Sequence, residues 1–318
     1  MEKRMNARSL LQTLGMLPVL IIICIFFFLV TSRFGSLQNI TIIVQQASIN
    51  TVLAAGMTFV ILTGGIDLSV GSILAASALV AVYTSLIPDI GMIGVPAAVV
   101  CGLVFGLFNG ALVSLVGLPP FIVTLGSLTA VRGIARLLGN DKTIFNTHMP
   151  FAFLGEGSVF GIPWLVIVAF LIVVISWFVL RRTVLGVHIY SVGGNPDAAR
   201  LSGIKVWRIL FFVYGTSGAL AGLAGAMSAA RLYAANGMQL GQSYELDAIA
   251  AVILGGTSLV GGIGSVWGTL VGALIIAVLS NGLILIGVSD IWQYIIKGLI
   301  IILAVTIDRV RLRNSART

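Results

Sequence analysis

Long apolar runs recur along the whole of this chain, and they restrict it to a membrane fold. A helix needs about twenty predominantly apolar residues to cross a bilayer, and about ten runs approach or reach this length. Hydrophobic residues make up 58% of the chain and charged residues only 9%, whereas roughly a quarter of the residues of a soluble protein are charged. The sequence therefore predicts an all-α integral membrane protein with about ten transmembrane helices.

The predicted spans follow one another without a long linker or a shift in composition, so residues 1–318 are expected to form a single membrane domain. The second and eighth runs are shorter than a full crossing, and their boundaries are the least defined by hydropathy. The first run lacks a small-residue cleavage pattern and is interpreted as a retained span rather than a signal peptide. The ten runs cover residues 14–30, 50–63, 70–87, 92–116, 121–138, 163–180, 209–230, 246–260, 266–286 and 291–307.

Basic residues gather in three places that an even number of spans would put on one side of the membrane: before the first span, in the loop 181–208 and after the last span. Cytoplasmic loops carry an excess of Lys and Arg, so this loop and both termini are expected to be cytoplasmic. Topology then explains the net charge of +8 better than nucleic-acid binding does. The basic residues are Lys3, Arg4, Arg8, Arg181, Arg182, Arg200, Lys205, Arg208, Arg309, Arg311, Arg313 and Arg317, with His188 partly charged at most.

The loop 181–208 contains the signals of one short capped helix. Asn195 suits the N-cap, Pro196 the first helical position and Asp197 the positive end of the helix dipole. Gly203 suits the stop signal. A capped surface helix held between two membrane spans is better suited to transmitting force than to catalysis. On the other side of the membrane, the mixed polar and apolar segment 139–162 is predicted to form a modest external cap.

Two Gly-rich segments, 60–72 and 252–265, share an apolar lead, a break and a closing Gly-Ser, and form a weak internal repeat. Duplication and chance both explain it. Each predicts a helix break, as in transporters with discontinuous helices. The residues of the two breaks are Gly64, Gly65, Asp67, Ser69 and Gly71 in the first, and Gly255, Gly256, Gly261 and Gly262 in the second. Elsewhere the small-residue spacing of Gly218 with Gly222 and of Gly268 with Gly272 indicates close helix packing.

Three acidic residues are expected at membrane depth, where a charge costs about 2.5 to 3.5 kcal/mol on insertion scales. Asp67 lies in the first break and can cap the following helix through the amides of Ser69 or Val70. Glu245 and Asp247 open the eighth span near its positive dipole end. We favour capping for all three, and the alternative is that they hold a gate between conformations.

Other polar residues in the spans admit two interpretations each. Arg132 and Arg136 lie on one helical face, and we expect Arg132 to pair with an acid and Arg136 to snorkel outward. A further set of polar residues has two equally good explanations. These residues either line a hydrated path for a hydroxyl-rich solute or form interhelical hydrogen bonds. The residues of this candidate path are Gln45, Gln46, Asn50, Asn109 and Asn281.

Several chemistries find no support in the sequence. There is no GxxxxGK[ST] motif, so we expect no nucleotide-hydrolysing site in this chain. His148 and His188 stand apart from any ligand cluster, and Cys24 and Cys101 are interpreted as small apolar residues. No serine or cysteine nucleophile has a plausible base nearby. We therefore predict neither an enzyme nor a metal site.

Four segments in combination, 56–72, 193–206, 244–265 and 281–289, resemble the permease subunit of ribose-type ABC sugar importers. The resemblance implies ten-helix subunits paired as a homodimer, or in some systems a heterodimer, in the bacterial inner membrane. It also implies a cytoplasmic ATP-binding subunit, which holds ATP and Mg, and an extracytoplasmic sugar-binding protein. This chain would bind no cofactor itself and would translocate a monosaccharide, a ribose-like pentose or a related sugar.

The resemblance also assigns the loop helix as the coupling helix that docks on the ATPase. Ala198, Leu201 and Ile204 are expected to form the buried contact, with Arg200 and Lys205 at the rim. A secondary transporter in which Asp67 or Glu245 titrates, and a non-transporting anchor or receptor, are the alternatives that fit less well. The expected coupling residues are Asn195, Pro196, Asp197, Ala198, Ala199, Arg200, Leu201, Ser202, Gly203 and Ile204.

Overall fold

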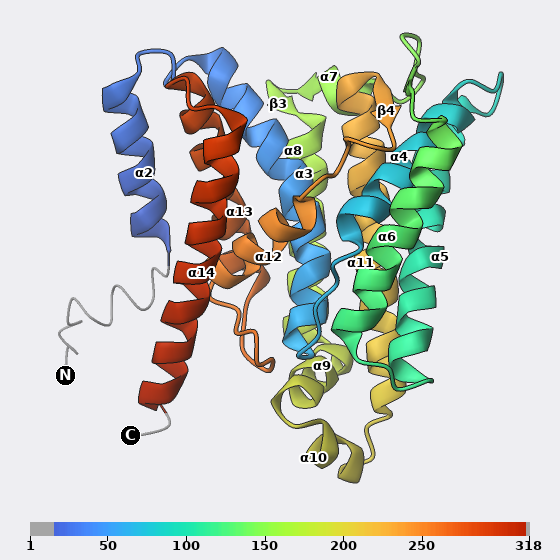
Figure 1. Cartoon of the computed structure of the whole chain (residues 1–318), viewed down its shortest axis with the longest axis vertical. Coiled ribbons are helices and arrows are strands. Elements are labelled where there is room, and N and C mark those ends of the chain that lie inside the picture. Colours follow the sequence, from blue (N-terminus) through green and yellow to red (C-terminus); the bar gives the residue numbers. More distant parts are fainter. Residues whose placement is uncertain (1–15, 316–318) are drawn as a thin grey trace.

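A computed structural model describes residues 16–315 as a bundle of helices with a few short strands (Figure 1). The first half contains α2 (Leu17–Val30), α3 (Leu37–Leu62), α4 (Val70–Ser85), the 3-10 turn η1 (Gly91–Ile93), α5 (Gly94–Ser114), α6 (Pro120–Gly139), β1 (Thr143–Phe145), α7 (Phe153–Glu156), β2 (Ser158–Val159) and β3 (Ile162–Pro163). The second half contains α8 (Trp164–Arg182), α9 (Val184–Gly194), α10 (Pro196–Leu201), α11 (Val206–Leu232), β4 (Ala234–Asn236), α12 (Tyr244–Leu254), α13 (Val266–Leu285) and α14 (Asp290–Ser315).

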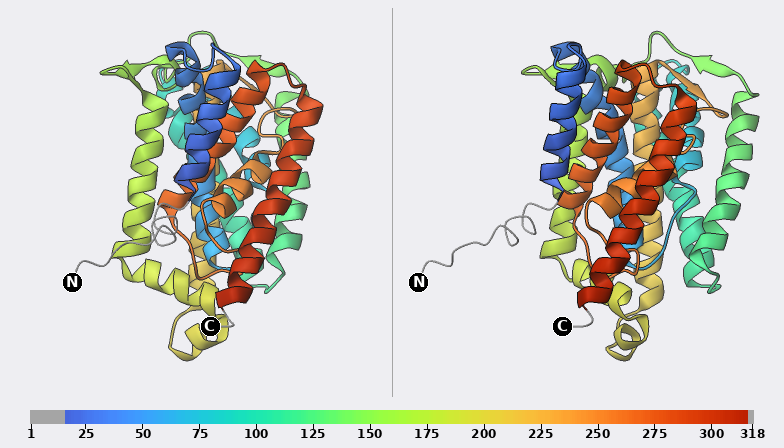
Figure 2. Two further views of the ribbon diagram at one scale, coloured as in Figure 1. Left: turned by 90° about the vertical axis from the view of Figure 1, so that its left-hand side faces the viewer. Right: turned by 60° about the vertical axis from the view of Figure 1, so that its left-hand side comes forward.

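The two ends of the bundle differ in what covers them. One end carries α9 and α10, and the opposite end carries α7 and the strands, in every view (Figures 1 and 2). There β1 pairs antiparallel with β4, with Thr143 opposite Asn236, and β2 pairs with β3. The predicted external segment 139–162 thus contains two strands, a short helix and the start of a third strand, fixed to the bundle through β4.

Six of the described helices are long and apolar enough to cross a membrane: α3, α5 with η1, α6, α8, α11 and α13. The shorter apolar helices include α2 and α4, and α14 runs for 26 residues. A helical membrane fold is therefore confirmed, while the count of ten spans and the side of the termini stay predictions. Lys3, Arg4, Arg8 and Arg317 lie outside the described residues, as do the side chains of Arg309, Arg311 and Arg313.

The prediction that the second span is shorter than a full crossing was wrong. It belongs to α3, a continuous helix of 26 residues. Polar residues in its first half lower the local hydropathy, but Ser48 and Asn50 are buried against the rest of the bundle. Because these groups face protein rather than lipid, the helix continues through a stretch that hydropathy alone interrupts.

The eighth span is short, as predicted. It forms α12, with 11 residues, which is about 16 Å of helix and roughly half of a bilayer core of about 30 Å. The break 255–265 continues from it to α13. The first break also leaves a short helix, since α4 has 16 residues and starts only after the non-helical segment that follows Leu62.

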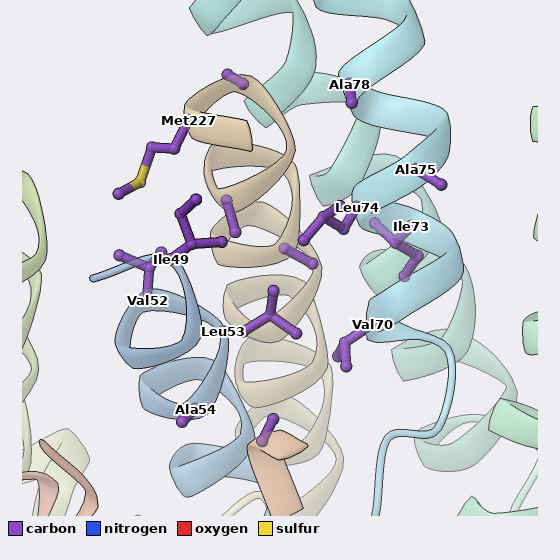
Figure 3. Packing of buried hydrophobic residues seen from close by; sticks show 14 of the residues in the cluster. Ile49, Val52, Leu53, Ala54, Val70, Ile73, Leu74, Ala75, Ala78 and Met227 are labelled. Carbon is purple, nitrogen blue, oxygen red and sulfur yellow. The ribbon is translucent and has the colours of Figure 1, made fainter. Parts of the chain in front are cut away.

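The core of the bundle is centred on α11, which packs against α5, α4 and α3. Figure 3 shows part of this core, where Ile49 of α3 lies beside Met227 of α11 and Leu74 of α4 points toward α11. These side chains are fully or almost fully buried. The central helices are therefore shielded by protein, and the outer helices α2, α5, α6 and α8 present many exposed apolar residues, as expected for a surface in contact with lipid.

Glycines bring α5 and α11 into backbone contact. A methyl group added to Gly218 would meet the carbonyl oxygen of Gly102, and one added to Gly222 would meet that of Ala98. The predicted packing role of Gly218 and Gly222 is thus confirmed. In the same way, a methyl group at Gly272 of α13 would meet the carbonyl oxygen of Ala251 in α12.

We predict that replacing Gly218 by valine destabilises the folded chain. The added side chain meets backbone atoms, which cannot swing aside, so the overpacking should lower the free energy of unfolding by about 1 to 3 kcal/mol. Thermal unfolding of the detergent-solubilised protein measures this. Gly126→Val is the matched control, because no atom lies within 4 Å of a methyl group added there. Equal unfolding temperatures for the two variants would contradict the packing interpretation.

Candidate functional site

The basic loop 181–208 forms two helices, α9 and α10, at one end of the bundle. The sequence predicted α10 but missed α9, which starts where the Thr183 hydroxyl accepts a hydrogen bond from the Gly186 amide (3.3 Å). Its buried residues include Ile189 and Val192. Helical spacing of these apolar residues after a threonine is an N-terminal helix signal, so the helix was open to prediction.

The caps of α10 are those that the sequence predicted. The Asn195 side-chain oxygen accepts hydrogen bonds from the amides of Asp197 and Ala198, both at 3.0 Å. Pro196 occupies the first helical position. Gly203 follows the helix with a φ of +86°, a conformation that glycine adopts without steric cost. Short as it is, α10 is therefore fixed at both ends by local interactions.

The outer surface of α10 is free, and its inner surface is anchored. Leu201 is 90% exposed and Ala198 is exposed, whereas Ala199 is buried against the bundle. Ile204 is half-buried and packs against the chain's own apolar core, so it belongs to the anchor more than to the predicted docking face. Arg200 lies 3.7 Å from Asp197, and an exposed pair of this kind contributes little to stability.

Behind α10, three segments far apart in the sequence meet at glycines. The Gly262 amide donates to the carbonyl oxygen of Leu62 (2.9 Å), the last residue of α3. A methyl group added to Gly193 of α9 would also meet that carbonyl oxygen, and one added to Gly261 would lie 2.9 Å from both the Gly64 nitrogen and the Gly193 carbonyl oxygen. We call Leu62, Gly64, Gly193, Gly261 and Gly262 the glycine junction.

The glycine junction joins the end of the bundle that carries α9 and α10 to both helix breaks. Gly64 opens the first break, and Gly261 and Gly262 belong to the second. A further hydrogen bond from the Tyr190 hydroxyl to the Gly264 carbonyl oxygen (2.9 Å) ties α9 to the second break. The helix α9 therefore contacts both the end of α3 and the segment that leads into α13. Neither contact was predictable from one segment alone.

Asp67 of the first break lies in a fully buried hydrogen-bond network. Its Oδ1 accepts from the Ser69 amide (3.0 Å) and the Ser69 hydroxyl (2.6 Å), and its Oδ2 accepts from the Ser217 hydroxyl of α11 (2.9 Å). Ser69 in turn accepts from Asn109 Nδ2 of α5 (2.9 Å), and Asn109 accepts from Ser127 of α6. The network connects the start of α4 to three neighbouring helices.

The Ser69 amide bond is the interaction that the capping interpretation requires. The bonds from the Ser69 and Ser217 hydroxyls go beyond capping, because they give the carboxylate the further hydrogen-bond donors that a buried charge needs. Gating by Asp67 stays a prediction. Asn109, a candidate for the hydrated path, takes part in this network.

The two acids of α12 differ in their partners. Asp247 accepts a hydrogen bond from Lys297 of α14 (Nζ to Oδ2, 2.9 Å), and both side chains are largely buried. Glu245 is half-buried, and its Oε2 would be met by a methyl group added to Gly71 at the start of α4. Lys297 was not predicted as a partner, although a lone lysine within the apolar run 291–307 is a signal for a buried ion pair.

The two arginines on α6 reach different partners. Arg132 donates to the backbone carbonyl oxygens of Gly237 (3.1 Å), Leu240 (2.6 Å) and Gly241 (3.2 Å), and it also interacts electrostatically with the expected kind of partner, the carboxylate of Glu245. Arg136 does reach the exposed end of α6, but there it forms two hydrogen bonds to Asp141 (2.7 and 2.8 Å). These bonds lower the pKa of the Asp141 carboxyl. Arg132 thus fixes the turn that leads into α12.

The structure does not bring the five candidate path residues together. Asn281 donates to Asn39 Oδ1 at the start of α3 (2.9 Å), Gln45 donates to the Gly155 carbonyl oxygen (3.2 Å), and Asn50 is buried. For Asn109, Asn281 and Gln45, interhelical or loop hydrogen bonds are the interpretation that fits. Gln46 differs, since it lines a polar cavity of about 420 Å³ between α3, the start of α12 and α14. We call it the outer polar cavity.

Comparison with known proteins places this arrangement in a family. The sequence matches the family described as "Branched-chain amino acid transport system / permease component" over residues 39–305, which is most of the chain. The chain belongs to this permease family. Together with the apolar helices, membership of the family makes the chain a multi-pass inner-membrane protein.

Similar members of the family carry sugar names. The ribose import permease protein of Bacillus subtilis (strain 168) is 44% identical over 97% of this chain and 96% of that protein. The corresponding protein of Escherichia coli (strain K12) is 42% identical over 94% of each chain, and the D-allose transport system permease protein of that strain is 40% identical over 91% and 89%. No solved structure matches. The resemblance to ribose-type permeases is confirmed.

We predict that Asp67→Asn is tolerated and Asp67→Ala is not. Asparagine retains an oxygen that accepts from the Ser69 amide and caps a helix well. Alanine leaves buried donors without an acceptor, at a cost of about 1 to 3 kcal/mol for each. Thermal unfolding of both variants in detergent, together with sugar uptake, checks this. Uptake lost in a well-folded Asp67→Asn variant would favour gating over capping.

Proposed function

We propose that this chain is the permease subunit of an ATP-binding-cassette importer that brings a monosaccharide, a ribose-like pentose or a related sugar, into the cell. A separate cytoplasmic subunit holds and hydrolyses ATP with Mg, and an extracytoplasmic binding protein delivers the sugar. Two copies of the chain pair as a homodimer. The names of the relatives support the sugar class, since those reported above are ribose and D-allose permeases.

The orientation follows from the charges at the two ends. Five described cations, Arg181, Arg182, Arg200, Lys205 and Arg208, lie from the end of α8 to the start of α11, and the excess of basic residues favours the cytoplasmic side for this end. The end with β1 and β4 then faces outward. Counting α2, α4, α12 and α14 with the six long helices supports ten spans with both termini cytoplasmic.

The exposed and capped helix α10 is the observation that carries the proposal. Leu201 offers an apolar side chain to a cytoplasmic partner, while Ala199 anchors α10 to the bundle. Closure of the ATPase moves α10, and α9 transmits the movement through the glycine junction to α3 and to the second break. The chain thereby contributes a sugar path and a lever and leaves ATP chemistry to its partner.

The environment of Asp67 supports ATP-driven over proton-driven transport. A proton-coupled carrier needs a carboxyl that exchanges protons with water during each cycle. Asp67 is fully buried, and its oxygens accept three hydrogen bonds from Ser69 and Ser217. These bonds fix the start of α4 against α11, a structural role that transport driven by a separate ATPase leaves undisturbed.

We predict that Leu201→Asp abolishes ATP-driven uptake by preventing the permease from holding the ATPase. The native chain, reconstituted with its ATPase and binding protein in proteoliposomes, should take up D-ribose with internal ATP even when an uncoupler collapses the proton gradient. The Leu201→Asp variant should insert normally but lose co-purification of the ATPase and lose uptake.

Phe160→Asp is the matched control, because Phe160 is an equally apolar, fully exposed residue at the opposite end of the bundle. That variant should retain the ATPase. Co-purification that persists in Leu201→Asp would remove α10 from the docking role. Uptake by the native chain that stops with the uncoupler and continues without ATP would replace the importer by a secondary transporter.

A further inference from the structure

The outer polar cavity is the least expected feature of a chain that is 58% hydrophobic. Every residue that lines it carries a polar side chain: three glutamines, two tyrosines, a serine and the pair Asp247 and Lys297. They come from three segments far apart in the sequence, α3, the start of α12 with the turn before it, and α14. Polar groups from separate helices that converge on one space at membrane depth mark a ligand path more often than a packing feature.

Its position suits a solute that enters from outside. Gln46 lies about 14 Å along α3 from Leu37, and Lys297 lies about 10 Å along α14 from its first residue, at roughly 1.5 Å per residue. Both helices begin at the end opposite α10 (Figure 1). The cavity therefore lies roughly 10 to 14 Å from the outer end of the bundle, with exposed Gln242 and Tyr294 at its edge, on the side on which a binding protein would release its sugar.

The charges around the cavity disfavour ions. Lys297 neutralises Asp247 through a hydrogen bond of 2.9 Å, so the lining carries no net charge. Among the described residues, no group of three or more His, Cys, Asp or Glu exists that could hold a metal ion. A free anion would face the carboxylate, and a cation would face the ammonium. A neutral solute rich in hydrogen-bonding groups is left as the fitting ligand.

The side chains match a polyhydroxylated solute in kind. Glutamine amides and tyrosine hydroxyls both donate and accept, as sugar hydroxyls do, and the ion pair adds one strong acceptor and one strong donor. The volume of about 420 Å³ falls at the small end of the roughly 300 to 1,000 Å³ of ligand pockets. The cavity lacks the apolar lining typical of tight sites, which suits a cargo that must also leave.

We propose that the outer polar cavity is a weak monosaccharide-binding station of the permease, in which Gln46, Gln293 and the Asp247–Lys297 pair hold sugar hydroxyls after release from the binding protein. This rests on the proposed function, because it assigns a place within the path of the same solute. It also assigns a role to the ion pair, since a buried pair is by itself weak evidence for a contribution to stability.

Cysteine protection tests the station directly. In the full-length chain in nanodiscs, with Cys24 and Cys101 replaced by alanine, Gln46→Cys is labelled with a methanethiosulfonate reagent in the presence of D-ribose. Ribose should slow the labelling by about threefold, the protection that a site two-thirds occupied by ligand gives. Dimethoxyethane, a neutral solute without hydroxyl groups, should not slow it.

Gln45→Cys is the matched control, since the adjacent side chain points to the Gly155 carbonyl oxygen and does not line the cavity. The proposal would be overturned if ribose left the labelling rate at position 46 unchanged. It would also be overturned if ribose slowed labelling equally at positions 45 and 46.

A second measurement separates this proposal from the proposed function. In proteoliposomes with all partner subunits, Gln46→Leu should reduce ribose uptake several-fold while ATP hydrolysis by the complex and co-purification of the ATPase stay at native values. Native uptake in Gln46→Leu would overturn the station and leave the importer intact. Absence of ATP-driven uptake by the native chain itself would refute the importer, whatever the labelling shows.

Discussion

Backbone contact at glycine is the constraint on which this structure depends. Lipid tails are as apolar as leucine side chains, so helices in a bilayer gain no hydrophobic energy by meeting and rely on close packing and hydrogen bonds. Between α5 and α11 the contact makes a rigid seam, where Gly218 faces the Gly102 carbonyl oxygen. At the glycine junction, close backbone contact at glycines joins the two helix breaks to α9. One backbone hydrogen bond, from the Gly262 amide to the Leu62 carbonyl oxygen, adds to this contact.

The polar groups within the bundle are of two kinds. Some form hydrogen bonds that join helices to one another, and others line the outer polar cavity. Asp67 and Arg132 belong to the first kind, because each has several hydrogen-bond partners within the protein. Both fix the chain beside a short helix, Asp67 before α4 and Arg132 before α12. The Asp247 and Lys297 pair belongs to the second kind, since it is paired and also lines the outer polar cavity.

Local signals in the sequence predicted local structure well, and tertiary contacts account for the rest. The caps of α10 involve Asn195 and residues two and three positions later, so one short window contains the whole interaction. The length of α3 was missed because its polar residues are buried by partners that hydropathy does not represent. Lys297 lies 50 residues from Asp247, and the hydrogen-bond partners of Asn109 and Arg132 likewise come from distant segments. A network or a junction appears only when the segments are folded together.

Ile204 and α9 refine the coupling end in the same manner. Apolar spacing put Ile204 on the docking face with Leu201, but packing against the bundle leaves Leu201 as the free side chain. In the proposed coupling, α10 acts on the bundle together with a second helix, α9, which it contacts.

The most direct test of this lever compares alanine at two adjacent glycines of α9, in the reconstituted importer with ATP hydrolysis and sugar uptake measured together. A methyl group at Gly193 would meet the Leu62 carbonyl oxygen, whereas one at Gly194 meets no atom within 4 Å. The account predicts that Gly193→Ala retains the ATPase and its hydrolysis but loses most uptake, and that Gly194→Ala behaves as the native chain. Equal uptake by the two variants would contradict transmission through the glycine junction.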